Sequence, residues 1–171
     1  MNMGDKLFEK HVSVGSGEGL RVDKEITINV PPAQVYSFWV NLENLARFMH
    51  HIESVTRTDL THSHWRVKTA AGKCVEWDAE IIAQRENEMI SWRSLPGAEV
   101  DNAGSVWFQP TADGRGTLVR VEMKYDPPGG KFGAVVAKIF GADAEREVEE
   151  SLGRLKKIME TGSLGEQLKA A

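Results

Sequence analysis

Hydrophobic and polar residues alternate along much of this chain, a pattern typical of strands with one buried face. In residues 21–30, Val22, Ile26 and Ile28 share one side, which predicts a half-buried first strand. The apolar residues of 31–49 recur instead every three or four positions, as on one face of a helix. We therefore expect the first strand to be followed by two short helices.

The segment from residue 62 to residue 83 predicts a hairpin with a defined register. A three-residue loop that ends in a left-handed Gly72 is a common hairpin connection. It sets Trp65 opposite Trp77 on one face and Arg66 opposite Glu76 on the other. A loop shorter by one residue would set apolar side chains against charged ones, so the three-residue loop is favoured.

Strand parity separates the two tryptophans of "ISWRSLPGAEVDNAGSVWF", residues 90–108. A two-residue loop at Glu86-Asn87 pairs Ile81 with Trp92, and so predicts that Trp92 points inward. The same loop pairs Ala83 with Ile90.

In the following strand, around "SVWF", the alternation predicts that the tryptophan points outward. If Phe108 faces Val119 on the inner side, Trp107 lies on the outer side opposite Arg120. That arrangement predicts a cation–π contact on a wet sheet face. A partner surface is the alternative, because exposed tryptophan is enriched at interfaces.

The last part of the chain has a helical pattern that ends at Gly162. The predicted order is a strand, two short helices, about six antiparallel strands and one long helix. No strand–helix alternation or glycine-rich nucleotide loop occurs, which argues against a Rossmann or P-loop protein. We expect an α+β fold in which the C-terminal helix covers one face of a curved antiparallel sheet.

Length and composition indicate one domain of 171 residues, with 41% hydrophobic and 27% charged residues. We expect a flexible lead-in at 1–20, a domain at 21–162 and a frayed tail at 163–171. The net charge of −4 and the lack of a basic cluster argue against nucleic-acid binding. With one cysteine, no signal peptide and no apolar run of about 18 residues, we expect a cytoplasmic protein.

Five segments together resemble a known family: "INVPPAQVYSFWVNLENLARFM", "VEWDAEI", "ISWRSLPG", "NAGSVWFQP" and "DPPGG" before the last helix. The chain resembles the START-like or SRPBCC superfamily, which has a helix-grip fold. Within it, the chain is similar to the bacterial polyketide cyclase/dehydrase-like group, near the coenzyme Q-binding START-like proteins. The resemblance covers residues 21–162, and none of its motifs is a catalytic signature.

This resemblance implies an apolar cavity between the sheet and the long helix, where family members hold lipids, quinones, polyketides or plant hormones. Inner-face aromatic residues either line such a cavity or fill it. Further candidates for ligand contact are a histidine at the junction between the helices and the sheet, and apolar residues before the last helix. The expected ligand-binding residues are His51, Trp65, Trp77, Trp92, Phe108, Val121, Met123, Tyr125, Phe132, Val136 and Phe140.

Other candidate chemistry falls on the outer face of the sheet. The alternating Glu76, Asp78 and Glu80 form a solvated charge ladder rather than a catalytic pair. His62 and His64 lie across from these carboxylates, and two histidines are too few for a dedicated metal site. Cys74 has no base partner in the sequence. We therefore predict no catalytic residue, no metal and no cofactor.

Three functions remain open at this point. The first is binding or carriage of a hydrophobic small molecule, with transient membrane contact through residues 131–141 as an added possibility. The second is a cyclase or dehydratase, which would need an acid or a base in the cavity, and the inward strand positions contain no Asp or Glu. The third is an interaction module with a filled core. The oligomeric state is not determined by the sequence.

Overall fold

A computed structural model describes residues 20–68, 72, 74–126 and 144–162. The first elements are strand β1 (Leu20–Ile28), helix α2 (Pro32–Val40), the 3₁₀ turn η1 (Leu42–Asn44) and helix α3 (Leu45–Phe48). Six strands follow: β2 (Ile52–Arg57), β3 (His62–Lys68), β4 (Cys74–Arg85), β5 (Met89–Ser94), β6 (Asp101–Pro110) and β7 (Thr117–Asp126). Helix α5 (Ala144–Thr161) comes last, so the expected element order is confirmed.

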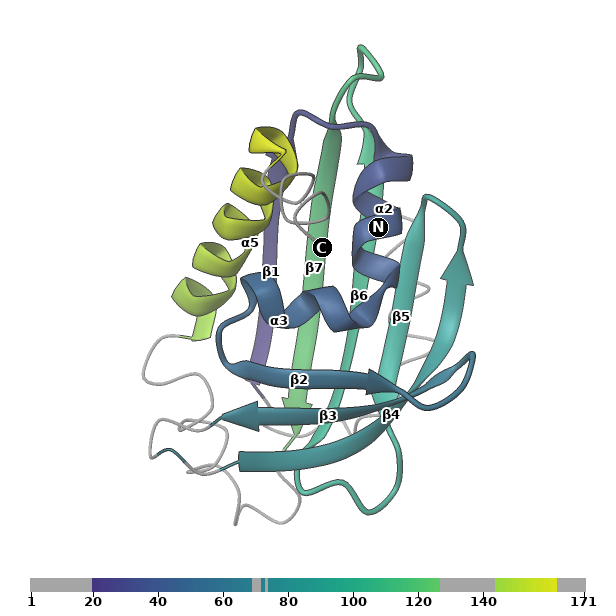
Figure 1. Cartoon of the computed structure of the whole chain (residues 1–171), viewed down its shortest axis with the longest axis vertical. Helices are drawn as coiled ribbons and strands as arrows, with labels where there is room; N and C mark the ends of the chain where they lie inside the picture. Colours follow the sequence, from purple (N-terminus) through teal and green to yellow (C-terminus); the bar gives the residue numbers. More distant parts are fainter. Residues whose placement is uncertain (1–19, 69–71, 73, 127–143, 163–171) are drawn as a thin grey trace.

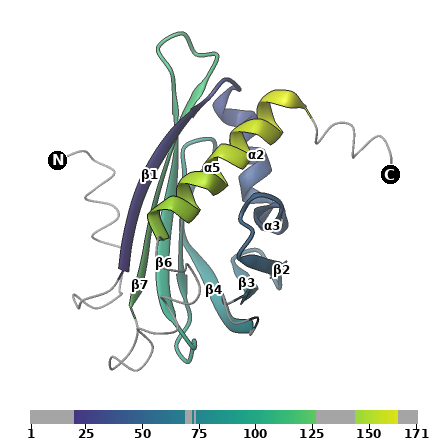
Figure 2. The ribbon, with the colours of Figure 1, turned by 90° about the vertical axis from the view of Figure 1, so that its left-hand side faces the viewer.

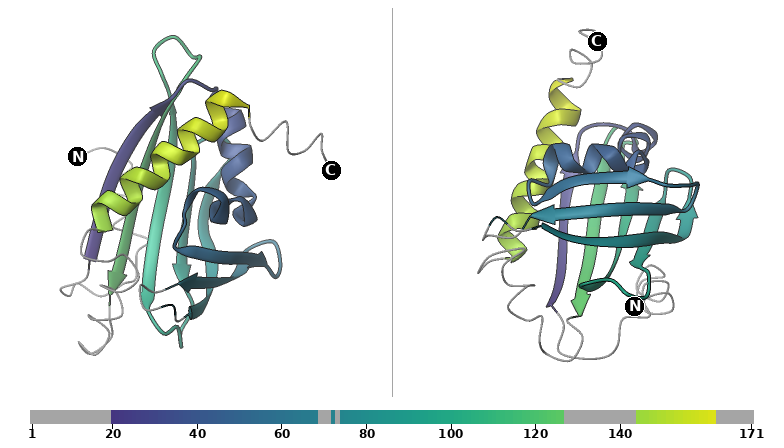
Figure 3. Two further views of the ribbon diagram at one scale, coloured as in Figure 1. Left: turned by 60° about the vertical axis from the view of Figure 1, so that its left-hand side comes forward. Right: turned by 60° about the horizontal axis from the view of Figure 1, so that its bottom comes forward.

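The strands form one antiparallel sheet in the order β1-β7-β6-β5-β4-β3-β2. Consecutive strands from β2 to β7 are hairpin neighbours, and β1 returns to pair with β7. The sheet curls so strongly that β2, β3 and β4 run across the direction of β1, β7 and β6 (Figure 1; Figure 3). This curl gives the sheet a concave side and confirms the helix-grip arrangement.

The predicted register of the β3–β4 hairpin is confirmed. Trp65 pairs with Trp77, Arg66 pairs with Glu76, and Gly72 has a φ of 80°. A φ in this range suits glycine because a Cβ would crowd the backbone.

The β4–β5 turn differs from the two-residue loop expected from the sequence. Arg85 pairs with Met89, so three residues form the turn, and Asn87 adopts a φ of 62°. A bulge between Ile81 and Ala83 absorbs the extra residue, which keeps Ile81 opposite Trp92 but sets Ala83 opposite Ser91. The prediction for Trp92 was therefore right, whereas the Ala83–Ile90 pair was wrong.

All the described helices lie on the concave side of the sheet (Figure 2). Helix α5 lies along β1 at the edge of the sheet and buries Val148, Leu152 and Leu155. Helix α2 contacts β6 in the middle of the sheet, and α3 contacts β2 at the edge opposite β1. The expectation that the C-terminal helix alone covers the sheet was therefore wrong, because the first two helices cover a large part of it.

The outer side of the sheet carries the predicted pair of Trp107 and Arg120. These residues are opposite each other, and the Arg120 guanidinium carbon lies 5.6 Å from the centroid of the Trp107 ring. Arg120 also binds Asp23 on β1 at 2.9 Å and the fully buried Glu122 on β7. The cation–π interpretation is confirmed, and it forms part of a larger charge network.

Candidate functional site

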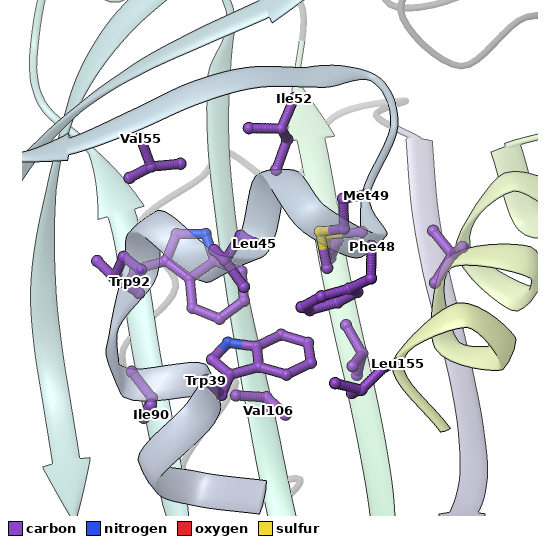
Figure 4. Close-up of a cluster of buried hydrophobic side chains, with 14 of the residues drawn as sticks. Trp39, Leu45, Phe48, Met49, Ile52, Val55, Ile90, Trp92, Val106 and Leu155 are labelled. Atoms are coloured by element: carbon purple, nitrogen blue, oxygen red, sulfur yellow. The ribbon is translucent and has the colours of Figure 1, made fainter. Parts of the chain in front are cut away.

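A cavity lies between the concave side of the sheet and the first helices. Its walls come from α2 and α3, from the segment that leads into β2, and from the inner faces of β2 to β7. The lining residues within the described part of the chain are Trp39, Leu45, Met49, His51, Ile52, Trp65, Val67, Trp77, Trp92, Asn102, Met123 and Tyr125. Figure 4 shows Trp39, Leu45 and Met49 on the helical segment and Ile52 on β2, all in one cluster of side chains with Trp92.

The enclosed space measures about 10 Å³. That is close to the minimum that one water molecule needs. A larger ligand therefore requires the lining side chains to move apart. Met49 and Met123 suit such a movement, because methionine is unbranched and changes rotamer readily.

Three near-parallel indole rings form an aromatic wall of the cavity. The Trp65 ring lies 6.2 Å from that of Trp77 and 6.4 Å from that of Trp92, with interplanar angles of 16° and 18°. Gly104 makes room for the third ring, since a Cβ built at Gly104 would lie 2.4 Å from an atom of Trp92. The wall thus depends on a glycine on the neighbouring strand, directly opposite Trp92.

The cavity contains few polar groups. Tyr125 is buried, and burial raises the pKa of its phenol well above the ordinary value, so the hydroxyl stays protonated. Its oxygen lies 3.8 Å from the sulfur of Met123. The Asn102 amide donates to the carbonyl of Val100 at 3.0 Å. The site is therefore an apolar cavity with a small number of fixed polar atoms.

At one end of the cavity, the structure brings a carboxylate to a histidine. The Nδ1 atom of His51 lies 3.9 Å from Oε1 of Glu147 in the first turn of α5. The His51 side chain is 8% exposed and that of Glu147 is 28% exposed. The interaction with His51, followed by the charge of Arg154, lowers the pKa of Glu147, although partial burial opposes this effect. Glu147 is therefore ionised at neutral pH, and its negative charge lies beside the imidazole.

Arg154 holds this end of the cavity together. Its Nε donates to the carbonyl of Phe48 at the end of α3 at 2.8 Å, and its Nη2 lies 3.5 Å from Glu147. The arginine thus links α5 to the segment from which His51 extends. The position of Glu147 beside His51 follows from this packing between two helices.

Residues 28–152 match the family described as "Polyketide cyclase / dehydrase and lipid transport". The chain belongs to this family. A Streptomyces lincolnensis protein described as an uncharacterized 17.2 kDa protein is 30% identical over 146 residues, which cover 82% of this chain and 89% of that protein. The expected family and fold are thereby confirmed.

Solved structures agree with this family assignment. A Deinococcus radiodurans protein is 34% identical with a TM-score of 0.69, over 84% of this chain and 98% of that one. The Zhui aromatase/cyclase from Streptomyces is 18% identical with a TM-score of 0.66, over 84% and 94% of the two chains. A START superfamily protein from Mycobacterium smegmatis is 16% identical with a TM-score of 0.64, over 82% and 97%. At such low identities, the last two show a shared fold.

The expected ligand-binding residues divide into three groups. Six of them line the cavity: His51, Trp65, Trp77, Trp92, Met123 and Tyr125. Phe108 and Val121 are buried but are not part of the described lining, because Phe108 packs edge-on against Tyr36 and Trp39 of α2. Phe132, Val136 and Phe140 lie outside the described residues.

Sequence reasoning missed the contribution of the first helices. Trp39 is on the helical stripe predicted for residues 31–49, but that stripe alone does not separate cavity wall from core. Met49 and Ile52 flank the turn that carries His51, and the hydrophobicity of this stretch was the available signal. Within the described chain, no α5 residue lines the cavity, so the first helices replace the expected wall.

The charged candidate residues of the outer face lie at the positions that the predicted β3–β4 register gives them. His64 Nδ1 is 2.8 Å from Asp78, His62 Nε2 is 3.8 Å from Glu80, and all four side chains are partly or largely exposed. The Cys74 thiol donates to Glu53 at 2.9 Å, near Arg66. This is the solvated ladder expected from the alternating charges.

The described residues contain neither a cluster of metal-ligating side chains nor a helix that could span a membrane. No group of three or more His, Cys, Asp or Glu side chains that could hold a metal ion occurs among them. None of the helices in the same part of the chain is long and apolar enough to cross a membrane.

Proposed function

We propose that this protein binds a hydrophobic small molecule in the cavity between the concave side of the sheet and helices α2 and α3. The observation that carries the proposal is an aromatic cavity with few polar groups, built by residues from eight elements and one connecting turn. The fold of the family supports hydrophobic ligand binding. A lipid, a quinone or a polyketide-like compound fits this chemistry.

Binding must open the cavity, and this requirement separates the proposal from a filled-core interaction module. Ligand entry would move Met49 and Met123, which are flexible, and leave the Trp65, Trp77 and Trp92 wall in place. A filled core would resist such opening, because interiors packed at native density lose contacts when they expand. The two alternatives therefore predict different responses to added ligand.

The direct test is native mass spectrometry of protein purified from its own host, followed by thermal shifts with quinones and fatty acids. We expect a bound mass that an organic solvent extracts, and a rise in melting temperature. Bare protein and no shift with either compound class would contradict the proposal.

A matched pair of variants localises the binding. Val67→Phe adds a ring to a lining position, whereas Lys68→Phe adds the same ring to the exposed side of the same strand. We expect the first to abolish the ligand-induced shift and the second to retain it. Val67→Ala, which enlarges the cavity, should bind in any case. Equal shifts in all three variants would place the ligand elsewhere.

A second candidate function, proton-transfer catalysis, is favoured by His51 and Glu147. Glu147 would hold the proton on Nδ1, so that Nε2 could take a proton from a carbon next to a carbonyl group. The inward strand positions contain no acid, but the fold brings Glu147 of α5 next to His51 at one end of the cavity. This arrangement suits a cyclase or dehydratase.

The benzisoxazole elimination assay tests this second candidate without knowledge of the substrate. A base removes the C–H proton of 5-nitrobenzisoxazole, the N–O bond breaks, and a coloured cyanonitrophenolate forms. We expect catalysis that His51→Gln abolishes and Glu147→Gln reduces. His64→Gln, which removes the exposed histidine, should not change it. A rate indifferent to His51 would exclude its role as a base.

Membrane contact and a cytoplasmic location stay predictions. Residues 131–141, which motivated the first, lie outside the described part of the chain. Co-sedimentation with anionic and neutral phospholipid vesicles would test it, and a lack of sedimentation with both would exclude it under those conditions.

A further inference from the structure

Two indole N–H groups are buried at the cavity without an acceptor. Trp39 is 0% exposed and Trp77 is 5% exposed, and both residues line the cavity. Their Nε1 atoms have no hydrogen-bond partner among the described residues. Buried polar groups in native proteins are nearly always paired, so each exception calls for a physical explanation.

The neighbouring tryptophan of the same wall shows what a satisfied indole looks like in this fold. Trp65 donates from Nε1 to the hydroxyl of Ser63, two residues earlier on β3, at 2.9 Å. Ser63 is itself buried, so the strand provides an acceptor inside the protein. No described residue accepts a hydrogen bond from Nε1 of Trp39 or Trp77. A phenylalanine at either position would provide an apolar ring without an unpaired donor, so the two indole N–H groups need a separate explanation.

Indole nitrogen only donates hydrogen bonds, so the missing partners must be acceptors. The rings of Trp77 and Trp92 lie within 18° of parallel to that of Trp65, so stacked aromatic rings line the cavity. Aromatic rings pack favourably against other aromatic rings, offset-stacked or edge-to-face, so a planar ring system suits this lining. The unpaired indole N–H donors and the aromatic lining together indicate a ligand that has hydrogen-bond acceptors and a ring system.

We propose, on the basis of the function proposed above, that the ligand is a planar apolar compound with carbonyl-type oxygens, and that Trp39 and Trp77 bind those oxygens through Nε1. In this role the two tryptophans determine specificity, and they select an oxygenated ring system over the corresponding hydrocarbon. A saturated acyl chain would satisfy neither donor along its length. Trp65 contributes surface and no selectivity, because its donor is already used.

The test compares fluorenone with fluorene, which have the same fused-ring skeleton with and without one ketone oxygen. Dissociation constants come from calorimetry on the full chain. We expect fluorenone to bind about five- to ten-fold more tightly, the range expected for one buried hydrogen bond. The carbonyl stretch of bound fluorenone should also shift to lower frequency, which apolar packing alone would not cause.

Three matched variants assign the selectivity. Trp77→Phe or Trp39→Phe should lower the fluorenone preference, and at least one of them should bring it close to unity. Trp65→Phe removes the same atoms from the same wall and should leave the preference unchanged. Circular dichroism confirms folding, and if one of the two variants fails to fold, the other still decides the assignment.

Each outcome separates this inference from the proposed function. If neither compound binds, this inference is wrong, and the thermal shifts with quinones and fatty acids decide separately whether the proposed function holds. If both bind equally, or fluorene binds more tightly, the cavity binds ligands but the donors do not select oxygens; an ordered water on each N–H would give this result. A preference that survives both Trp39→Phe and Trp77→Phe overturns the assignment to these two residues.

Discussion

His51 and His64 each lie beside a carboxylate, but on opposite sides of the structure. The outer pair is shorter, with His64 Nδ1 2.8 Å from Asp78, yet its side chains are 38% and 62% exposed. The inner pair is longer, with His51 3.9 Å from Glu147, and its side chains are 8% and 28% exposed. Water competes for the outer pair and screens it, whereas partial burial strengthens the electrostatic interaction of the inner pair.

The comparison shows that distance alone does not identify a functional pair. On the outer face, His64 belongs to a ladder of alternating charges whose side chains are partly or largely exposed to water. On the inner face, His51 faces an apolar cavity in which a proton transfer would be protected from bulk water. The two histidine–carboxylate pairs therefore differ in environment, because they lie on opposite faces of the sheet.

The largest effect should come from crowding the inner wall. Gly104→Ala places a Cβ within 2.4 Å of the Trp92 ring, which is packed against the other indoles and cannot turn aside. We expect a loss of about 1–3 kcal/mol in the free energy of unfolding, measured by urea denaturation. In Gly153→Ala, on the exposed side of α5, nothing lies within 4 Å of the new Cβ, and the change should stabilise the protein by about 0.5–1 kcal/mol. Equal effects would show that the inner wall is not tightly packed.

A smaller difference should separate two tryptophans of the same wall. Trp65→Phe breaks a hydrogen bond and leaves the buried Ser63 hydroxyl without it, whereas Trp77→Phe removes a donor that has no partner in the described chain. We expect Trp65→Phe to cost about 1–2 kcal/mol more than Trp77→Phe. Urea denaturation of both variants without ligand measures this difference. A larger cost for Trp77→Phe would mean that its donor is satisfied in solution.

On the outer face, Trp107→Leu removes the ring that Arg120 covers. The loss should be about 0.5–1 kcal/mol, the value typical of exposed cation–π pairs. Arg120 keeps its contacts with Asp23 and Glu122, which limits the damage. Trp107→Phe should lose less, because it retains an aromatic face. Denaturation curves for both variants would contradict the contact if leucine and phenylalanine behaved alike.

The two histidine–carboxylate pairs should have the smallest effects on the free energy of unfolding. These effects should appear in different pH ranges. The pKa of Glu147 is lowered from 4.5, so its stabilisation is present above pH 4.5 and is lost as the pH falls through the lowered value. The pKa of His64 is raised from 6.5 by its hydrogen bond to Asp78, so its stabilisation is present below pH 6.5 and is lost as the pH rises through the raised value.

Unfolding free energies of two variants across pH would test this separation. Glu147→Gln should flatten the acidic part of the profile, and His64→Gln the part above pH 6.5. If either variant altered the other window instead, the assignment of these pairs to separate environments would be wrong.

The sequence by itself determined the fold class, the order of elements and most strand registers. Alternation has a period of two, so a slip by one residue would set Trp65 and Trp77 on opposite faces, and the three-residue loop gives the register that keeps both buried. The same parity correctly placed Trp92 inside and Trp107 outside. The β4–β5 turn escaped prediction because a bulge near Ile82 compensates for an extra turn residue, and alternation does not reveal it.

Only the tertiary structure decided which inner residues surround the cavity. Inward direction is a local property of a strand, whereas lining a cavity depends on which helix packs opposite. Thus α2 covers Phe108, while Trp77 stays at the cavity. Glu147 and His51 are far apart in the sequence, and helix packing through Arg154 brings them together. Local patterns determine faces, but the contact between distant elements determines the site.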